Sequence, residues 1–165
     1  VRINEVFFIL TKICKIKRLS GSSHIKTPES LKKKRAIVNV QNNEDDDDCF
    51  ILSVLSLLKR DEIVRHLGRA SNYQQFKNCL KLKNCQLPMR LIDIPCFEAQ
   101  NPGIAINVLT YQETNFINKE DNENPGLKHP CIDIIHRTKV VDVEPLYLLL
   151  LEEGDRFHYT AVHNL

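Results

Sequence analysis

The sequence lacks any run of roughly 18 consecutive apolar residues, the length that a membrane-spanning helix needs. Its first apolar stretch, Val6 to Leu10, is too short for the hydrophobic region of a secretory signal, and no small-residue cleavage site follows it. We therefore expect an intracellular protein, of the cytoplasm or nucleus, that does not contact a membrane. In that reducing setting the six cysteines should remain thiols and not form a disulfide framework: Cys14, Cys49, Cys79, Cys85, Cys96 and Cys131.

Motifs for cofactors and metals are also missing. With only five glycines, the chain has neither a glycine-rich phosphate loop nor a dinucleotide-binding fingerprint. Cys79 and Cys85 are separated by five residues, and His129, Cys131 and His136 follow much later, so neither group has the spacing of a zinc finger. We therefore expect no metal and no cofactor.

The composition fits one soluble domain. A chain of 165 residues with 42% hydrophobic and 27% charged residues can bury a single core and stay in solution. The net charge is only +2, but the first 35 residues are basic, so weak nucleic-acid contact through them is an alternative to a solvated charge run. We expect a partly ordered basic leader over residues 1–35 and one α+β domain over 36–165. The chain starts at Val1 and stops directly after a strand pattern, which predicts a piece of a longer polypeptide, truncated at its C-terminus.

A helix is predicted over residues 49–58, directly after a loop with five consecutive acids at 44–48. Its apolar residues recur at helical spacing, so one face should be buried. That face carries Phe50, Val54 and Leu58. Asp47 or Asp48 should cap the exposed amides of the first turn. Cys49 then lies at the helix N-terminus.

The rest of the pattern divides into further helices and a later sheet. Helices are predicted over 61–69, 71–80 and 93–99, the last one ended by Asn101-Pro102-Gly103. Strands are predicted over 36–40, 104–108, 131–141, 146–151 and 157–162, with a long polar loop over 112–130 and a hairpin turn at Gly154-Asp155. Helices followed by an antiparallel sheet define an α+β fold.

A cysteine in the first turn of a helix can act as a nucleophile, because the positive end of the helix dipole favours the thiolate. His158 lies on the last predicted strand and could take the thiol proton of Cys49. A cysteine on an early helix with a histidine on a later strand is the papain-type layout. The neighbouring acids oppose thiolate formation, and the simpler alternative is that they cap the helix while Cys49 is a small buried residue.

Four segments resemble a domain in proteins of Polinton-type self-synthesising DNA transposons. They are GSSHIKTPESLKKKRAIVNVQNN (21–43), DDCFILSVLSLL (47–58), LPMRLIDIPCFEAQNPGIAINVLTY (87–111) and YLLLLEEGDRFHYTAVHNL (147–165). In those proteins the domain lies upstream of zinc fingers and a family B DNA polymerase. Its layout is similar to that of papain-like and ovarian-tumour-type thiol hydrolases. The resemblance implies a papain-like cysteine-protease fold, with Cys49 as the nucleophile and His158 as the general base.

Several residues are candidates for a third catalytic group. The resemblance favours Asn164, but six residues along a straight strand cover about 20 Å, so the chain would have to turn back for Asn164 to orient His158. Thr160 faces the same side of the strand as His158, two residues away. Asn107 or Asp142 could come from a neighbouring strand.

Two functions follow from these residues. The first is hydrolysis of a peptide or isopeptide bond in a mobile-element protein, with its own polyprotein or a ubiquitin-like tag as the substrate. In this hypothesis Gln41 or Asn43, from the loop before the helix, could donate to an oxyanion. The second is an inactive interaction module tethered to a transposon DNA polymerase. The two hypotheses differ in whether Cys49 and His158 meet in space.

Overall fold

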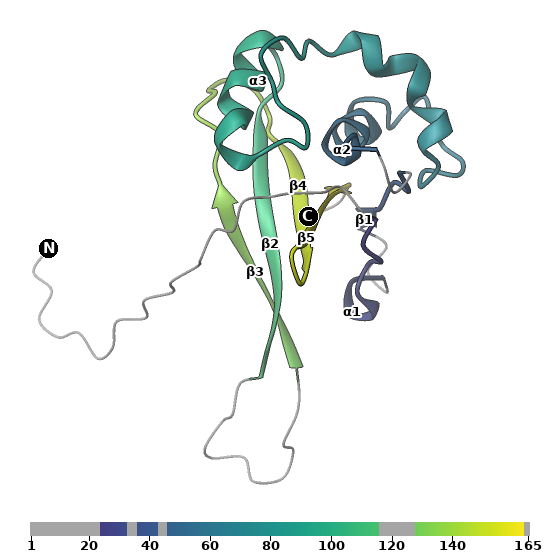
Figure 1. Cartoon of the computed structure of the whole chain (residues 1–165), viewed down its shortest axis with the longest axis vertical. Helices are drawn as coiled ribbons and strands as arrows, with labels where there is room; N and C mark the ends of the chain where they lie inside the picture. Colours follow the sequence, from purple (N-terminus) through teal and green to yellow (C-terminus); the bar gives the residue numbers. More distant parts are fainter. Residues whose placement is uncertain (1–23, 33–35, 43–45, 116–127, 164–165) are drawn as a thin grey trace, which may run out of the picture.

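A five-stranded sheet is the central element of the computed structural model, which describes residues 24–32, 36–42, 46–115 and 128–163 (Figure 1). Its strands lie in the order β1-β5-β4-β2-β3. Their bounds are β1 Ile37–Val38, β2 Ile106–Asn115, β3 Lys128–His136, β4 Leu146–Glu153 and β5 Arg156–Val162. Helices and a sheet share one chain, so the predicted α+β class is confirmed in this coarse form.

The sheet is mixed because β2 pairs antiparallel with β3 on one side and parallel with β4 on the other. β2 pairs antiparallel with β3, and residues 137–145 then carry the chain across to the other side of β2, where β4 runs parallel to it. The pairings of β1 with β5 and of β4 with β5 are antiparallel. The prediction of a wholly antiparallel sheet was therefore wrong. Alternation within a strand specifies which residues share a face, but it does not specify the neighbouring strand.

Helix α2, Cys49–Leu58, packs against one face of the sheet and contacts mainly β5 (Figure 1). The predicted start and length of this helix are confirmed, and Phe50 and Val54 are fully buried. The prediction of a single buried face was wrong, because every residue from Cys49 to Ser56 is buried, whereas Leu58 is 41% exposed. A helix that is buried on nearly all sides must be enclosed by other elements.

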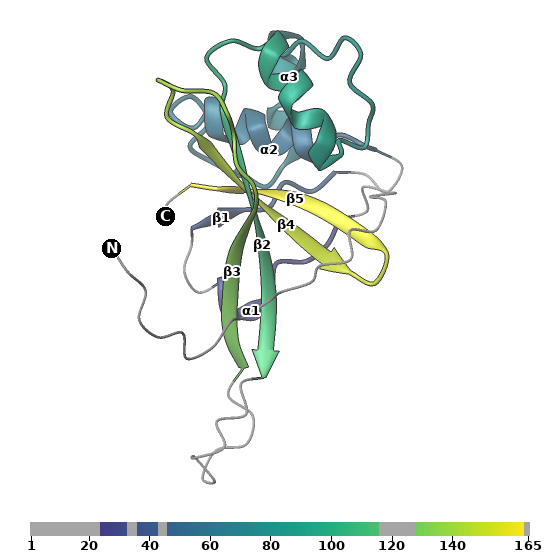
Figure 2. The ribbon, with the colours of Figure 1, turned by 90° about the vertical axis from the view of Figure 1, so that its left-hand side faces the viewer.

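Short helices complete the cover of α2. They are η1 Ala70–Asn72, η2 Gln74–Cys79, η3 Leu91–Asp93 and α3 Ile94–Gln100. The helix predicted over 71–80 is therefore replaced by 3-10 turns, whereas the helix predicted over 93–99 is confirmed, with Pro95 in its first turn and Asn101 directly after it. Figure 2 shows α2 and α3 together at one end of the molecule, with the β2–β3 pair projecting away from them.

The helix predicted over residues 61–69 was wrong, since this segment forms turns. His66 has a positive φ of 54°, which an α-helix does not accommodate. The Gln41 amide donates to the Gly68 carbonyl at 2.8 Å, so part of this backbone bonds to a distant segment. A Cβ at Gly68 would lie 3.1 Å from the Asn39 carbonyl oxygen, so the close approach favours glycine there. Tertiary contact determines the shape of this segment.

The strands differ from the prediction mainly in their ends. β4 and β5 are confirmed, and the turn between them contains Gly154 at a φ of 65°. β2 continues to Asn115 and β3 begins at Lys128, so both ends of the predicted loop over 112–130 are strand. β3 ends at His136, five residues before the predicted end.

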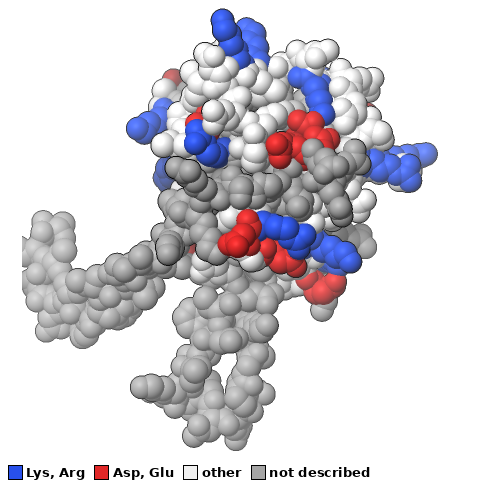
Figure 3. Space-filling view, in the orientation of Figure 1, with Lys and Arg blue, Asp and Glu red and all other residues white. Residues whose placement is uncertain are grey.

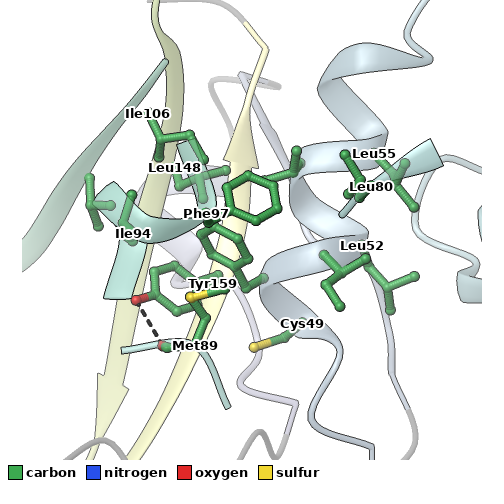
Figure 4. Close-up of a cluster of buried hydrophobic side chains, with 14 of the residues drawn as sticks. Cys49, Leu52, Leu55, Leu80, Met89, Ile94, Phe97, Ile106, Leu148 and Tyr159 are labelled. Carbon is green, nitrogen blue, oxygen red and sulfur yellow. Dashed lines mark hydrogen bonds between the residues drawn. The ribbon is translucent and has the colours of Figure 1, made fainter. Parts of the chain in front are cut away.

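A large apolar cluster, here called the helix-side core, fills the space between the sheet and the helices (Figure 4). Three aromatic rings form its centre: Phe50 meets Phe97 edge-to-face at 5.2 Å and Tyr159 at 5.3 Å between centroids. Such pairs add to the stabilisation that comes from burial. The position of α2 against β5 is therefore fixed by packing around Phe50.

A second cluster lies on the opposite face of the sheet and is here called the far-face cluster. It contains Ile25, Leu31, Leu109, Leu149 and Leu151. Its first two members belong to residues 24–32, here called the N-terminal strap, which includes α1, Glu29–Lys32. Part of the predicted leader therefore packs against the sheet. Consecutive residues of β4 alternate between the two clusters, as expected for a central strand.

Candidate active site

Cys49 is the first residue of α2 and is 3% exposed, with its sulfur directed from the helix towards the strands (Figure 4). Asp48, one of the two predicted caps, occupies the N-cap position, but its side chain makes no capping hydrogen bond. Its carboxylate pairs instead with the Lys77 ammonium of η2. This ion pair offsets part of the acidic charge that precedes the helix.

β1 is shorter than β5 and does not pair with the backbone of Tyr159, which interacts instead with side chains of α2. The His163 amide donates to the Ala36 carbonyl at 2.7 Å, so the amides two and four residues earlier on β5 point to the same edge. β1 pairs only as far as Ala161, which leaves the Tyr159 amide beyond its end. The Tyr159 backbone lies close enough to the Cys49 thiol at this place to lower its pKa.

Ser53, one helical turn after Cys49, satisfies the other backbone group of Tyr159. Its hydroxyl donates to the Tyr159 carbonyl at 2.9 Å, and the serine is fully buried. Residues four apart lie on one face of a helix, so both side chains reach the same strand residue. The Tyr159 hydroxyl also donates to the Met89 carbonyl at 3.2 Å. These contacts hold the sulfur of Cys49 at the edge of β5.

The thiol of Cys49 is neutral at physiological pH. Burial is the main cause and raises its pKa to about 11, and the charges of Asp47 and Asp48 act in the same direction. Backbone hydrogen bonds with Tyr159 and Phe50 oppose this increase. The helix N-terminus therefore does not ionise the thiol in this state, and forming the thiolate requires a base.

His158 projects from the face of β5 opposite to α2. It is fully buried and lies across from Leu151 of the far-face cluster. Its Nε2 lies 2.8 Å from Oδ1 of Asn39, and its Nδ1 is buried without a hydrogen-bond partner. Because an amide oxygen can only accept, this contact assigns the proton to Nε2. Nδ1 is then the basic nitrogen of the ring.

Asn39 is a functional candidate that the sequence analysis missed. It follows β1, and its side-chain nitrogen donates to the Ile25 carbonyl at 2.7 Å and to the Thr27 hydroxyl at 3.0 Å. These two bonds fix the amide so that its oxygen faces His158. In the sequence Asn39 is only a polar residue within the alternating pattern of 36–40, and that pattern does not predict that His158 is its partner.

The N-terminal strap closes over His158. The His24 and His158 rings meet edge-to-face with centroids 5.3 Å apart. Burial, and to a smaller extent the charge of His24, lower the pKa of His158 to about 4. Burial, together with the charge of Lys26, also lowers the pKa of His24, against an opposing hydrogen bond with Asn39. Both imidazoles are therefore neutral near pH 7.

The structure brings Cys49 and His158 to the same stretch of β5 without a hydrogen bond between them. The sulfur interacts with the backbone of Tyr159, which directly follows His158 on β5. Neither group shifts the pKa of the other: His158 is not among the causes of the raised Cys49 pKa, and Cys49 is not among the causes of the lowered His158 pKa. The resting arrangement is thus a neutral thiol and a neutral imidazole on opposite sides of one strand edge.

Two of the predicted residues, Asn43 and Asn164, lie outside the described residues, so their predicted roles stay predictions. Gln41, the other oxyanion candidate, has an exposed side chain, and its backbone is bonded to Gly68. It lies eight residues before the first residue of α2 and forms an isolated bridge with Arg69. Its contribution to an oxyanion site also stays a prediction.

Two of the other candidates for a third catalytic group, Thr160 and Asn107, have separate hydrogen-bond partners. Thr160 faces the same side as His158, as predicted, but its hydroxyl donates to a β4 carbonyl at 3.2 Å. Asn107 lies on β2, two strands from β5, and its oxygen accepts the Thr138 amide at 2.9 Å. Asp142 lies between β3 and β4 at a φ of 62°. Among the described residues, Asn39 is the one that bonds to the His158 ring.

Comparison of this chain with protein-family models, with curated proteins and with solved structures gives no match. Within the described residues, no group of three His, Cys, Asp or Glu side chains is placed to hold a metal ion. No helix in that part of the chain has the length and apolar character needed to cross a membrane. On the face shown in Figure 3, Lys and Arg side chains form separate groups with Asp and Glu between them, so the described surface there offers no continuous basic strip.

Proposed function

We propose that this domain is a thiol hydrolase that cleaves a peptide or isopeptide bond. Cys49 is the nucleophile, His158 the general base and Asn39 the residue that orients the imidazole. The observation that carries the proposal is the bonding of His158: Nε2 is held by the Asn39 oxygen, Nδ1 is buried without a hydrogen-bond partner, and the sulfur of Cys49 interacts with the backbone of the next residue on the same strand. Nucleophile, base and orienting group is the arrangement that thiol catalysis requires.

Catalysis begins when the thiol proton moves from Sγ of Cys49 to Nδ1 of His158. The thiolate then attacks the carbonyl carbon of the scissile bond, and the imidazolium returns the proton to the leaving amine as an acyl-enzyme forms. Water, deprotonated by the same imidazole, releases the acid product. The Asn39 oxygen accepts the hydrogen bond from Nε2–H throughout, which keeps Nδ1 available and stabilises the imidazolium.

The described state is closed, because Cys49 is 3% exposed and His158 is fully buried. Displacing the N-terminal strap would admit water to the imidazole and raise its pKa from about 4 towards the ordinary value of 6.5. An imidazolium near the sulfur would in turn lower the thiol pKa. The proposal therefore includes opening of the strap when substrate binds.

The resemblance to a domain of Polinton-type transposon proteins supports a protein substrate. Two classes fit a thiol hydrolase in that setting, namely the polyprotein that contains the domain and a ubiquitin-like protein attached through an isopeptide bond. Both present a carbonyl to the nucleophile and an amine as the leaving group, so the proposed chemistry is the same for each.

A second candidate function is an interaction module without catalysis, tethered to a transposon DNA polymerase. The burial of both groups favours it, because a thiol with a pKa of about 11 and an imidazole with a pKa of about 4 do not exchange a proton near pH 7. In that case Ser53 and Cys49 serve only to attach α2 to β5.

Alkylation of a strap-loosened variant separates the two functions. Leu31→Ser removes an apolar anchor of the strap, and iodoacetamide labelling near neutral pH is followed by peptide mass spectrometry, with exposed Cys79 as the internal reference. A hydrolase predicts that Cys49 in this variant reacts faster than Cys79, and that adding His158→Ala slows it by at least about tenfold. An equal rate with and without His158 would support the interaction module. Labelling of Leu31→Ser by a ubiquitin-type or peptide electrophile then identifies the substrate class.

A further inference from the structure

Two thiols away from the candidate active site share one amide group. Gln100, the last residue of α3, places its Nε2 3.4 Å from Sγ of Cys85 and 3.4 Å from Sγ of Cys96. The same nitrogen lies 3.1 Å from the Cys96 carbonyl, one helical turn earlier. The nearby thiol of Cys96 also helps to raise the pKa of Cys85, after the effect of burial. The chain thus holds two reduced sulfurs around one amide nitrogen.

Both sulfurs can be approached from solvent. Cys96 is exposed and Cys85 is partly exposed. A hollow of about 690 Å³ opens beside Gln100, and its lining residues are Lys81, Leu82, Lys83, Ala99, Gln100 and Pro102. Two ammonium groups on this lining favour an anionic molecule over a cationic one.

We propose that Cys85 and Cys96 form a reversible disulfide by exchange with an anionic low-molecular-weight disulfide, of which oxidised glutathione is an example. The more exposed Cys96 attacks first as the thiolate, which forms a mixed disulfide and releases one small thiol. Cys85 then loses its proton and attacks the Cys96 sulfur, which releases the second small thiol. The small disulfide is reduced to two thiols, and the two cysteines are oxidised to one bond of about 2.05 Å.

Bond formation has a defined structural consequence. It closes a ring on residues 85–96, which connect the turn after η2 to α3. Within this ring the Met89 carbonyl accepts the Tyr159 hydroxyl, and the Arg90 guanidinium pairs with the Asp93 carboxylate. Oxidation therefore ties the cover of the helix-side core to α3. This inference does not depend on the thiol-hydrolase proposal, because neither cysteine takes part in that chemistry.

The native full-length chain, incubated with oxidised glutathione, tests the proposal. Intact mass and unreduced peptide maps should show a product lighter by about 2 Da, with the peptides of Cys85 and Cys96 linked. Dithiothreitol should reverse the change. Cys79→Ser, which removes another exposed thiol, should leave the product unchanged. Cys85→Ser should stop at a mixed disulfide on Cys96.

Three outcomes would overturn it. They are a mixed disulfide that persists on Cys96 in the unsubstituted chain, a dominant link from either cysteine to Cys79, and an unlinked product. Far-UV circular dichroism verifies that the serine variants are folded. The peptide map of the unsubstituted chain decides the question even if a variant does not fold.

Discussion

Acidification should destabilise this domain through His158. In the folded chain, burial lowers the pKa of this imidazole to about 4, whereas unfolding restores its ordinary value of 6.5. Between these two values the unfolded state binds a proton that the folded state does not bind. The free energy of unfolding therefore rises with pH from about 4 to about 6.5, and it is lost as the pH falls through this window.

The magnitude follows from the two pKa values. Their difference corresponds to roughly 3 kcal/mol, of which about 2 to 3 kcal/mol is lost between pH 7 and pH 4.5. His158→Gln should remove this contribution, because glutamine does not titrate and its amide can still donate to the Asn39 oxygen. The variant should therefore lose less stability than the unsubstituted chain over the same pH interval.

Urea unfolding followed by far-UV circular dichroism at pH 7 and pH 4.5 measures the effect. The matched control is His66→Asn, because His66 is exposed and asparagine tolerates its positive φ of 54°. The control should keep the pH dependence of the unsubstituted chain. If His158→Gln also keeps it to within about 0.5 kcal/mol, burial of the imidazole does not control acid stability, and the reasoning fails.

Further substitutions test the attachment of α2 to β5. Ser53→Ala leaves the Tyr159 carbonyl unpaired and should lower the free energy of unfolding by about 1 to 3 kcal/mol. Ser56→Ala is the control, because the Ser56 hydroxyl bonds to the Ser53 carbonyl within the helix, and it should lower the free energy of unfolding clearly less. Equal losses for the two variants would contradict this account. Burial raises the pKa of Cys49 from 9.0 to about 11, so this thiol should contribute a loss of about 2 kcal/mol between pH 9 and pH 11, and Cys49→Ser should remove that part of the loss in urea titrations. Phe97→Ala should cost about 3 to 5 kcal/mol by calorimetry, and a loss below about 1 kcal/mol would show that the helix-side core repacks around it.

The sequence predicted the elements whose formation depends on local pattern. The apolar repeat of 49–58 was sufficient for α2, and the run 146–151 with Gly154 was sufficient for β4 and its turn. Proline in the first turn of α3 was a comparable local signal. In each case the residues that form the element also carry the information for it.

Elements that depend on distant partners were not predictable in this way. Residues 61–69 have helical spacing, but their backbone forms turns and bonds to Gln41 through Gly68, which no local pattern reveals. The parallel pairing of β2 with β4 depends on the path of residues 137–145 around β2. Nearly the whole of α2 is likewise buried because several elements surround it, and the spacing of apolar residues along 49–58 does not predict how many elements will pack against the helix.

In the candidate site, too, the residues with a local sequence signal could be predicted and those that depend on distant contacts could not. A cysteine at the start of a helix and a histidine on the last strand could be identified from the pattern, and both positions agree with the structure. Asn39 could not, because its relation to His158 depends on β1 and β5 lying side by side. His24 was placed in a leader, and only the packing of the N-terminal strap brings it to the His158 ring.

Opening of the site should involve the N-terminal strap and not α2. The strap is anchored by Ile25 and Leu31, whose burial contributes about 1.5 to 3 kcal/mol each, and by two hydrogen bonds from Asn39. Moving α2 would expose six buried apolar side chains and break the paired contacts with Tyr159, at a cost several times larger. The strap covers the imidazole, whereas α2 holds the sulfur at the strand edge. The lower-energy motion therefore uncovers the imidazole of His158 and leaves the sulfur of Cys49 in place at the strand edge.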